Sequence, residues 1–439
     1  MNELAARFLP DDDAQRHLLH NEVHARPSAR VRLPALLTYV AVLNDGIDRE
    51  QEWQHLRALP GQANLTLAAL SSNFLRLRCE GFTLKWERHT EFTRYSVVQA
   101  WPGEGALSDS LVQVATGGQW LRDIPGRTMA AIQLAMVEGE IDAPDLIERA
   151  RHWLGEGTLF GSRLGNTQSG QAHSLWLTHF RLGGDGFERM WVAAPAGTAE
   201  GRAGRISQRI LELETYRLMA LRGLPVAKQL AGMLSEAEDQ LARITARMED
   251  KTDSDEALLD DLVSLAARIE RATAEHGYRF AATRAYDALV SQRIAELRER
   301  PHSGIQTVGE FMQRRLSPAM ATVAATDRRL TALSERVARA SALLRTRVDI
   351  ATETQNRQLL EKLTRGQEMQ LRLQTTVEGL SIAAISYYAL SLLMVLIKAA
   401  KDAGVPLRPE LTAGLLTPVV VWVVWRASRR LHERILGPH

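Results

Sequence analysis

The chain has 439 residues, enough for two or three domains, and its charges almost balance, with a formal net charge of +2. This balance, and the lack of a long basic run in the polar part of the chain, argue against nucleic acid as a partner. One cysteine, Cys79, excludes an intramolecular disulfide and a thiolate metal cluster, which suits a reducing compartment. The start of the chain lacks the apolar core of a signal peptide, so we expect the polar part to stay in the cytoplasm.

Residues 1–200 mix strand-like and helix-like segments and predict a cytoplasmic α/β domain of the α+β class. Strands are expected at 34–43, 128–137, 159–164, 174–182 and 187–193, and helices at 45–59 and 144–153. Residues 73–100 alternate between polar and apolar, which is typical of a β-meander, with turns at 80–81 and 89–91. The GGDG run at 183–186 indicates a hairpin turn, because the lysine and helix start of a phosphate-binding P-loop do not follow it.

Residues 201–378 are rich in helix formers and predict a long-helix stalk or coiled region. Three helices are expected, at 203–250, 255–300 and 307–378. Pro225 and Pro318 should each kink or interrupt a helix, since proline removes a backbone hydrogen bond. The third helix has no stop signal before Gly379, so we expect it to continue into the apolar segment that follows.

Two uncharged runs, 379–397 and 411–425, predict a transmembrane hairpin over residues 379–425. As helices the two runs would be about 28 Å and about 22 Å long, so the first matches the hydrocarbon thickness and the second is short for it. Helix-breaking glycine and proline lie in the linker between them. The alternative interpretation is a buried helical hairpin in a soluble core.

The flanks of the second run suggest how the hairpin is oriented. Trp422 and Trp425 suit the membrane interface, and a basic tail, 426–439, follows with Arg426, Arg429 and Arg430 at its start. Because basic flanks prefer the cytoplasm, we expect a multi-pass protein with both its N- and C-termini in the cytoplasm.

The best metal-like group is formed by His20, Glu22 and His24, whose imidazole and carboxylate groups are common metal ligands. On a strand all three would share one face, whereas on a helix only the two histidines would. The alternative is that Asn21, Glu22 and Arg26 tie an N-terminal arm to the domain by hydrogen bonds. No cofactor is identified by these patterns.

Other polar residues have milder interpretations. Within the spans, Ser381, Ser386, Tyr387 and Ser391 are expected to pack helices together or to line a pore. In the cytoplasmic part, Glu214 and Arg217 have the spacing of an ion pair on one helix face. The glycine-rich stretch 155–170 could hold an anion, although a loop at a strand edge is the simpler interpretation.

Three longer stretches read LHNEVHARP at 19–27, ETYRLMALRGLPVA at 214–227 and LQTTVEGLSIAAISYY at 373–388. They resemble a family of bacterial uncharacterised membrane-anchored proteins, the domain of unknown function 3422. The resemblance extends over essentially the full chain. It implies anchoring in the bacterial cytoplasmic (inner) membrane, and it implies no activity.

The architecture is also similar, more loosely, to that of CorA-type magnesium channels, which have an α/β domain, long stalk helices and two C-terminal spans. The Gly-Met-Asn filter of those channels has no counterpart here, because the end of the first span reads LIKAAKDAG at 396–404. Lys398 and Lys401 in this stretch would repel a divalent cation. The resemblance therefore bears on architecture more than on selectivity.

Taken together, these patterns favour a membrane-anchored homo-oligomer of unknown activity, with the lipid bilayer as partner and a structural, regulatory or sensory role. The alternative is a CorA-like oligomeric ion channel or transporter that the cytoplasmic domain gates. A second alternative is a membrane-bound enzyme that uses a metal at His20, Glu22 and His24. An enzyme is the less favoured class, because the chain has no GxSxG nucleophile motif or recognisable triad signature.

Overall fold

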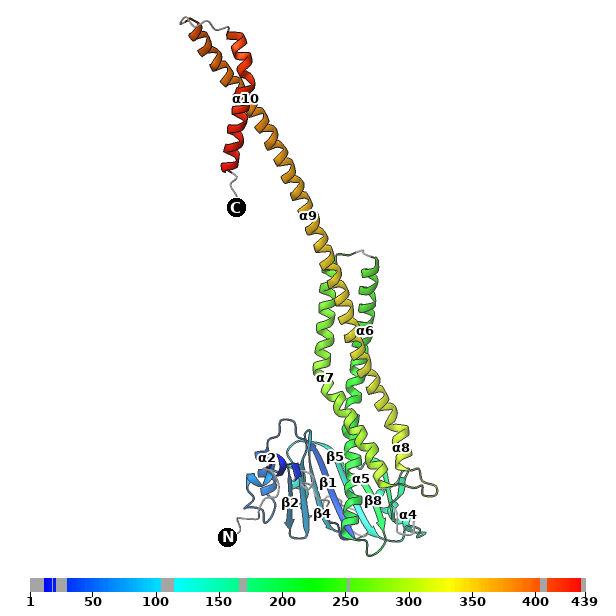
Figure 1. Ribbon diagram of the computed structural model, residues 1–439. Coiled ribbons are helices and arrows are strands. Elements are labelled where there is room, and N and C mark those ends of the chain that lie inside the picture. Colours follow the sequence, from blue (N-terminus) through cyan, green and yellow to red (C-terminus); the bar gives the residue numbers. More distant parts are fainter. Residues whose placement is uncertain are drawn as a thin grey trace, which may run out of the picture. The chain divides into compact units, whose positions relative to one another are not determined.

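A mixed eight-stranded sheet organises the N-terminal part of the protein (Figure 1). The computed structural model describes residues 12–17, 19–20, 30–103, 114–165, 172–250, 253–402 and 409–435. The strands are β1 (Ala35–Leu43), β2 (Phe74–Cys79), β3 (Phe82–Arg88), β4 (Phe92–Ala100), β5 (Arg127–Glu138), β6 (Phe160–Leu164), β7 (Ser174–Leu182) and β8 (Glu188–Ala194). These bounds confirm the predicted strands and the predicted meander.

The strands lie in the order β2-β3-β4-β1-β5-β8-β7-β6. Every neighbouring pair is antiparallel except β5 and β8, which are parallel. The chain between β5 and β8 forms a helix and the β6–β7 hairpin, and this long connection allows β8 to lie parallel to β5. The meander and the later hairpin therefore belong to one α+β sheet, with β1 and β5 near its middle.

The two faces of the sheet differ in chemistry, because successive side chains of a strand point to opposite faces. The helices on the apolar face are α2 (Arg49–Arg57), the 3-10 turn η1 (Leu67–Leu70), α3 (Gly118–Arg122) and α4 (Leu146–Leu154). Val40, Leu84 and Trp86 belong to the core under α2, η1 and α3, and Leu177 belongs to the core under α4. The opposite face is covered by α5, which packs against β5.

Long helices make up most of the rest of the described chain. They are α5 (Glu200–Leu221), α6 (Gly223–Asp250), α7 (Asp255–Leu297), the short α8 (Val308–Arg315), α9 (Ser317–Asp402) and α10 (Pro409–Ile435). The single helices predicted at 203–250 and 307–378 are each wrong in one respect. A break at Arg222 divides the first into α5 and α6, and a break at Leu316 divides the second into α8 and α9. Pro225 and Pro318 lie in the first turns of α6 and α9, where a missing N–H costs least. Helix α9 continues unbroken past residue 378, as the lack of a stop signal predicted.

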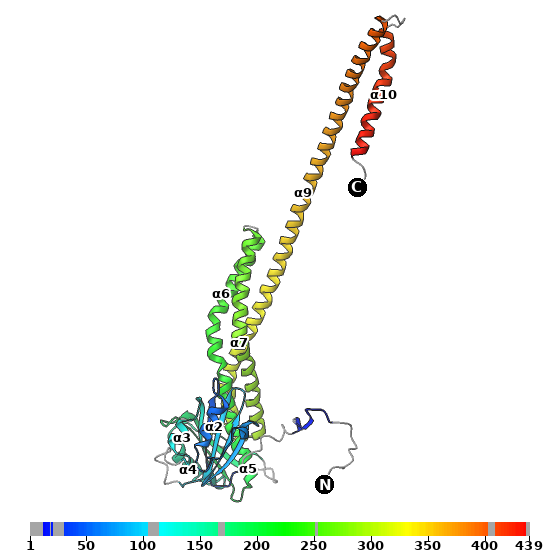
Figure 2. The same ribbon diagram turned by 90° about the vertical axis from the view of Figure 1, so that its left-hand side faces the viewer.

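Helices α6, α7 and the start of α9 run side by side (Figures 1 and 2). Their buried apolar residues recur at helical spacing: Leu234, Leu241 and Ile244 in α6, Leu262, Leu265 and Ile269 in α7, and Leu330, Leu333 and Val337 in α9. Ion pairs join the helices at their rims, with Arg329 Nη2 2.8 Å from Glu238 Oε2 and Arg247 Nη1 2.8 Å from Asp261 Oδ2. The helical region is therefore a three-helix bundle over this part of its length.

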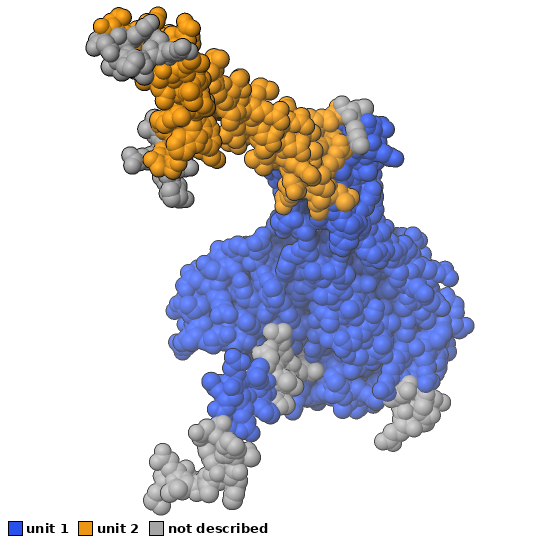
Figure 3. All heavy atoms as spheres, turned by 45° about the horizontal axis from the view of Figure 1, so that its top comes forward, with its two compact units in different colours: residues 1–252, 260–340 blue, residues 253–259, 341–439 orange. Residues whose placement is uncertain are grey.

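The chain divides into two compact units (Figure 3). The first consists of residues 1–252 with 260–340 and contains the sheet, α5, α6 and most of α7. The second consists of residues 253–259 with 341–439 and contains most of α9 and all of α10. The predicted domain bounds, with divisions after residues 200, 378 and 425, stay predictions.

Candidate functional site

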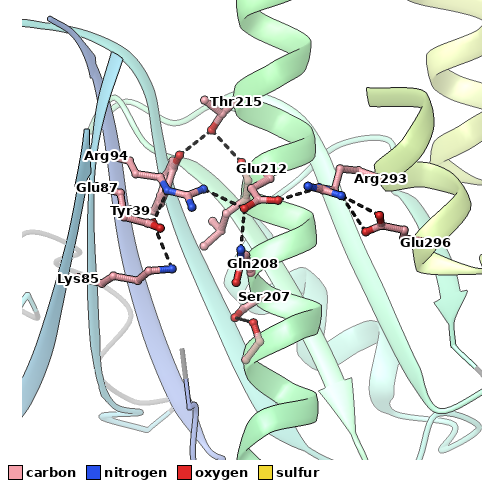
Figure 4. Close-up of polar contacts among 12 residues, drawn as sticks. Tyr39, Lys85, Glu87, Arg94, Ser207, Gln208, Glu212, Thr215, Arg293 and Glu296 are labelled. Atoms are coloured by element: carbon pink, nitrogen blue, oxygen red, sulfur yellow. Dashed lines mark hydrogen bonds and ion pairs between the residues drawn. The ribbon is translucent and has the colours of Figure 1, made fainter. Parts of the chain in front are cut away.

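A row of buried charged side chains lies between the sheet and α5 (Figure 4). Lys85 and Glu87 project from β3, and Arg94 projects from neighbouring β4, all on the face opposite the apolar core. Glu212 of α5 contacts Arg94, and Arg293 of α7 contacts Glu212 from the other side. Two strands and two helices, far apart in the sequence, therefore build one polar site.

Neighbouring side chains in this row alternate in sign. Lys85 Nζ lies 3.1 Å from Glu87 Oε2, and the same oxygen accepts a hydrogen bond from Arg94 Nε. Arg94 Nη1 lies 3.1 Å from Glu212 Oε1, and Arg293 Nε lies 2.7 Å from Glu212 Oε2. Each charge has an opposite charge beside it, which offsets the free-energy cost of removing it from water.

The row continues from α7 back to α5. Arg293 Nη1 lies 2.8 Å from Glu296 Oε1, and Glu296 Oε2 lies 3.2 Å from Arg209 Nε. We call the seven residues Lys85, Glu87, Arg94, Glu212, Arg293, Glu296 and Arg209 the charged row. The charged row leads from the buried face of β3 to Arg209, whose side chain is 35% exposed.

Burial and opposite charges act against each other on the pKa values in the charged row. Burial raises the pKa of Glu87, but Arg94 and Lys85 outweigh burial and lower that pKa to about 2. Burial also raises the pKa of Glu212, and Arg94, Gln208 and Arg293 bring it below its ordinary value. Both carboxyl groups are therefore ionised at neutral pH.

We expect acid to destabilise the protein through Glu87. The pKa of Glu87 is lowered from 4.5 to about 2 on folding, so its stabilising contribution is complete above pH 4.5 and is lost as the pH falls towards 2. Urea unfolding followed by tryptophan fluorescence at several pH values measures this loss. A double variant, Lys85→Met with Glu87→Gln, removes both charges and should lose less stability over the same pH range. If the free energy of unfolding fell equally with pH in the native chain and the double variant, Glu87 would not be the group responsible.

A second group of buried carboxyls lies on the same face of the sheet. Glu188 of β8 and Glu214 of α5 are both buried, and burial followed by the charge of Glu214 raises the pKa of Glu188 well above its ordinary value. Arg217 Nε donates to Glu214 Oε2 at 2.7 Å, which confirms the predicted pair of Glu214 and Arg217. Thr178 Oγ1 donates to Glu188 Oε1 at 3.1 Å. Burial and the neighbouring Glu214 carboxylate therefore favour the protonated form of Glu188 where β8 faces α5.

A cavity of about 420 Å³ lies at the outer end of the charged row. Its described lining includes Leu164, Gly165, His173, Arg202, Arg205, Ile206, Arg209, Glu296, Leu297 and Arg298. Three of the arginines belong to α5, and Arg298 directly follows α7. Arg209 and Glu296 belong to both the cavity and the charged row, so the two features form one candidate site. Guanidinium groups collected around a cavity can bind an anion.

The glycine-rich stretch 155–170, for which the sequence suggests an anion site, contributes Leu164 and Gly165 to the lining of the cavity. Residues 166–170 of this stretch lie outside the described residues. Ser162 of the same stretch is instead structural, since its Oγ donates to Glu299 Oε2 at 2.7 Å and accepts from the Val308 backbone N–H at 3.1 Å. The arginines of α5 were missed, although their spacing of three and four residues places them on one side of a helix.

The predicted metal ligands are only partly within the described residues. His20 is described, whereas Glu22 and His24 lie outside the described residues, so the proposed group stays a prediction. Within the described ranges, no cluster of three or more histidine, cysteine, aspartate or glutamate residues could hold a metal ion.

The ends of α9 and α10 expose apolar side chains. Two helices among the described residues are long and apolar enough to cross a membrane, and only 6% of the apolar window of each is buried. Of the predicted packing or pore residues, Ser386 is buried, while Ser381, Tyr387 and Ser391 are exposed. Whether these residues pack helices or line a pore stays a prediction.

The residues predicted for the membrane interface form two stacked pairs on α10. The guanidinium carbon of Arg426 lies 4.9 Å from the centre of the Trp422 ring, and that of Arg429 lies 4.9 Å from the centre of the Trp425 ring. Arg430 is exposed beside them. One turn of helix separates the members of each pair, which places arginine and tryptophan in the same surface strip.

Comparisons with known proteins identify a family and no activity. No curated protein and no solved structure matches the chain, so the looser similarity to CorA-type channels is not shown. A family model matches residues 11–435 and so includes all three stretches that the sequence singled out. The chain belongs to the family described as "Protein of unknown function (DUF3422)".

Proposed function

We propose that the protein is anchored in the bacterial cytoplasmic (inner) membrane by the apolar parts of α9 and α10, with its α+β sheet and helical bundle in the cytoplasm. The exposed apolar windows of these two helices carry the proposal. A core helix of a soluble protein buries most of its apolar side chains, whereas Leu380, Leu392 and Leu415 are 74%, 67% and 76% exposed. Contact with lipid would remove these side chains from water.

A transmembrane hairpin is the arrangement that we propose for the two helices. Its support is that α10 runs back beside the end of α9 in both ribbon views (Figures 1 and 2). The stacked tryptophan–arginine pairs suit the headgroup region, where an aromatic ring and a cation are both well solvated. Since these arginines follow the second span, they favour a cytoplasmic C-terminus.

A labelling experiment tests this topology. In a Cys79→Ser background, which removes the native thiol, Asp402→Cys and Glu353→Cys each place one exposed thiol on α9. We expect a membrane-impermeant maleimide to label Asp402→Cys on intact spheroplasts and to label Glu353→Cys only after lysis. The native chain should also stay in the membrane pellet after an alkaline carbonate wash. Release by carbonate, or equal labelling of both cysteines before lysis, would contradict the anchor.

We further propose that copies of the chain associate through the exposed part of α9 before the first span. Leu359, Leu363, Leu373 and Val377 are each 57–61% exposed. Their positions alternate by four and three residues along the sequence when Gly366 and Gln370 are included, which is the spacing of a coiled-coil seam. A seam of this kind complements itself, so a second copy of α9 is the partner that suits it best.

The oligomer is tested by light scattering on the detergent-purified protein, with the detergent contribution subtracted. We expect a mass that is a multiple of the mass of the single chain. Leu363→Lys should shift this mass towards that of one chain, because the lysines of two copies would face and repel each other across the seam. A monomer at every accessible concentration would contradict association through this part of α9. In either case the role that we propose for the anchored protein is structural, regulatory or sensory.

A further inference from the structure

The cavity at the outer end of the charged row is strongly cationic. Its described lining contains four arginines, Arg202, Arg205, Arg209 and Arg298, and one glutamate, Glu296, which leaves a net charge of +3 when His173 is neutral. Burial, and then the charge of Arg202, lowers the pKa of His173, so its ring is uncharged at neutral pH. The lining therefore offers guanidinium donors together with one neutral imidazole.

The charged row holds one of these arginines in position. Arg209 contacts Glu296 at 3.2 Å, Glu296 contacts Arg293 at 2.8 Å, and Arg293 contacts Glu212 at 2.7 Å. Glu212 is buried on the side of α5 that faces the sheet, so this series of contacts connects the cavity wall to the folded core. Donors that are already oriented lose little conformational entropy when a ligand binds.

Arg298 is held by its backbone. It directly follows α7 and has a φ of 49°, a left-handed conformation that usually selects glycine at the end of a helix. The backbone N–H of Gly165 donates to the carbonyl of Leu297, which fixes this helix end against the strand β6. An arginine therefore occupies a position where the backbone favours glycine, and its side chain lines the cavity.

The start of α5 contributes one of these arginines. The residue before the helix, Ala199, makes no side-chain capping hydrogen bond, and Arg202 follows in the first turn. Backbone N–H groups in the first turn of a helix carry partial positive charge and point along the helix axis. The cavity, however, lies along the flank of α5 from Arg202 to Arg209, and the first turn also contains the acidic Glu200. The arginine side chains therefore supply the positive charge of the cavity.

From these observations we propose that the cavity binds a small molecule that carries a phosphate or diphosphate group. The planar guanidinium group matches two phosphate oxygens at once, and several such groups suit a multiply charged anion better than a single carboxylate. The volume of about 420 Å³ lies in the range of small-molecule sites and exceeds what a phosphate alone would fill. The proposal does not depend on whether α9 and α10 cross a membrane.

Calorimetric titration of the full-length protein in detergent, with inorganic pyrophosphate as the probe, tests this site. We expect saturable binding at constant ionic strength, and we expect Arg205→Gln and Arg298→Gly each to weaken it by about ten- to hundred-fold. Arg298→Gly separates binding from stability more clearly, because glycine readily adopts the backbone conformation of Arg298. The midpoint of unfolding of this variant should therefore not fall. Arg243→Gln, an exposed arginine of α6 outside the cavity, is the matched control and should bind as the native chain does.

The outcomes separate the proposal from general charge attraction. Heat changes that do not saturate, or that sodium sulfate reproduces at equal ionic strength, would overturn it. So would native-like affinity in both cavity variants. A short-chain phosphatidic acid presents the same phosphate chemistry from a lipid, and whichever of the two ligands binds more tightly identifies the source of the phosphate.

Discussion

Glu87→Gln is expected to destabilise the protein by about 3–5 kcal/mol, the usual cost of removing one partner from a buried ion pair. Glu87 is 1% exposed and lies between two cations, Lys85 and Arg94, which are themselves almost completely buried. The substitution keeps the size of the side chain and removes its charge, so both cations would remain buried beside a neutral amide. Urea unfolding of the full chain in detergent, followed by tryptophan fluorescence, measures the change.

The matched control for this prediction is Glu238→Gln. Glu238 pairs with Arg329 at 2.8 Å, but the two side chains are 33% and 40% exposed, so the pair should contribute at most about 1 kcal/mol. The double variant Lys85→Met with Glu87→Gln should recover part of the stability lost in Glu87→Gln, because it removes one of the two unbalanced cations. If Glu87→Gln and Glu238→Gln have equal effects, the charged row is not a buried network.

Two arginines in the first apolar run are expected to prevent its insertion into a membrane. Tyr388 and Leu392 are 68% and 67% exposed on the part of α9 that we assign to the first span. An arginine in the middle of a membrane helix costs about 2.5–3.5 kcal/mol, so Tyr388→Arg with Leu392→Arg should cost about 5–7 kcal/mol. The measurement is the share of the protein that stays in the membrane pellet after an alkaline carbonate wash.

The corresponding substitutions on the bundle are the control. Tyr278 and Val263 of α7 are 61% and 58% exposed, and Tyr278→Arg with Val263→Arg adds the same two charges there. These changes should leave the membrane-bound share unchanged, because surface substitutions in water have small effects. Equal retention of both double variants in the pellet would show that the exposed apolar run of α9 does not enter lipid.

The strands could be predicted because the pattern that defines them is local. In β3, Leu84 and Trp86 alternate with Lys85 and Glu87, and this alternation is enough to place a strand. The same alternation suggests that the charged side faces water, yet both charged residues are buried. The cover is α5, which lies more than a hundred residues later in the chain, and no local pattern can report so distant a contact.

A signal for that cover does exist in α5. Glu212 and Glu214 alternate with Leu211 and Leu213, so this part of the helix has no purely polar side. When such a helix packs against a sheet, some of its charged side chains lie on the buried side. The surface of the sheet that it covers is then expected to be polar as well. The arginine cavity was harder to predict, because Arg298 joins the arginines of α5 only through the fold of α7.

Helices α5 and α7, which cover the charged face of the sheet, are synthesised after all the strands of that sheet. The last strand ends at Ala194, and the ribosome needs roughly 5–20 s more to reach Arg293 at about 5–20 residues per second. During that interval the nascent sheet can form with the face bearing Lys85, Glu87 and Arg94 still open to water. Because this face is charged, the unfinished sheet would aggregate with other nascent chains less readily than a sheet with two apolar faces. The charged face that α5 covers in the finished protein would thus protect the unfinished sheet during synthesis.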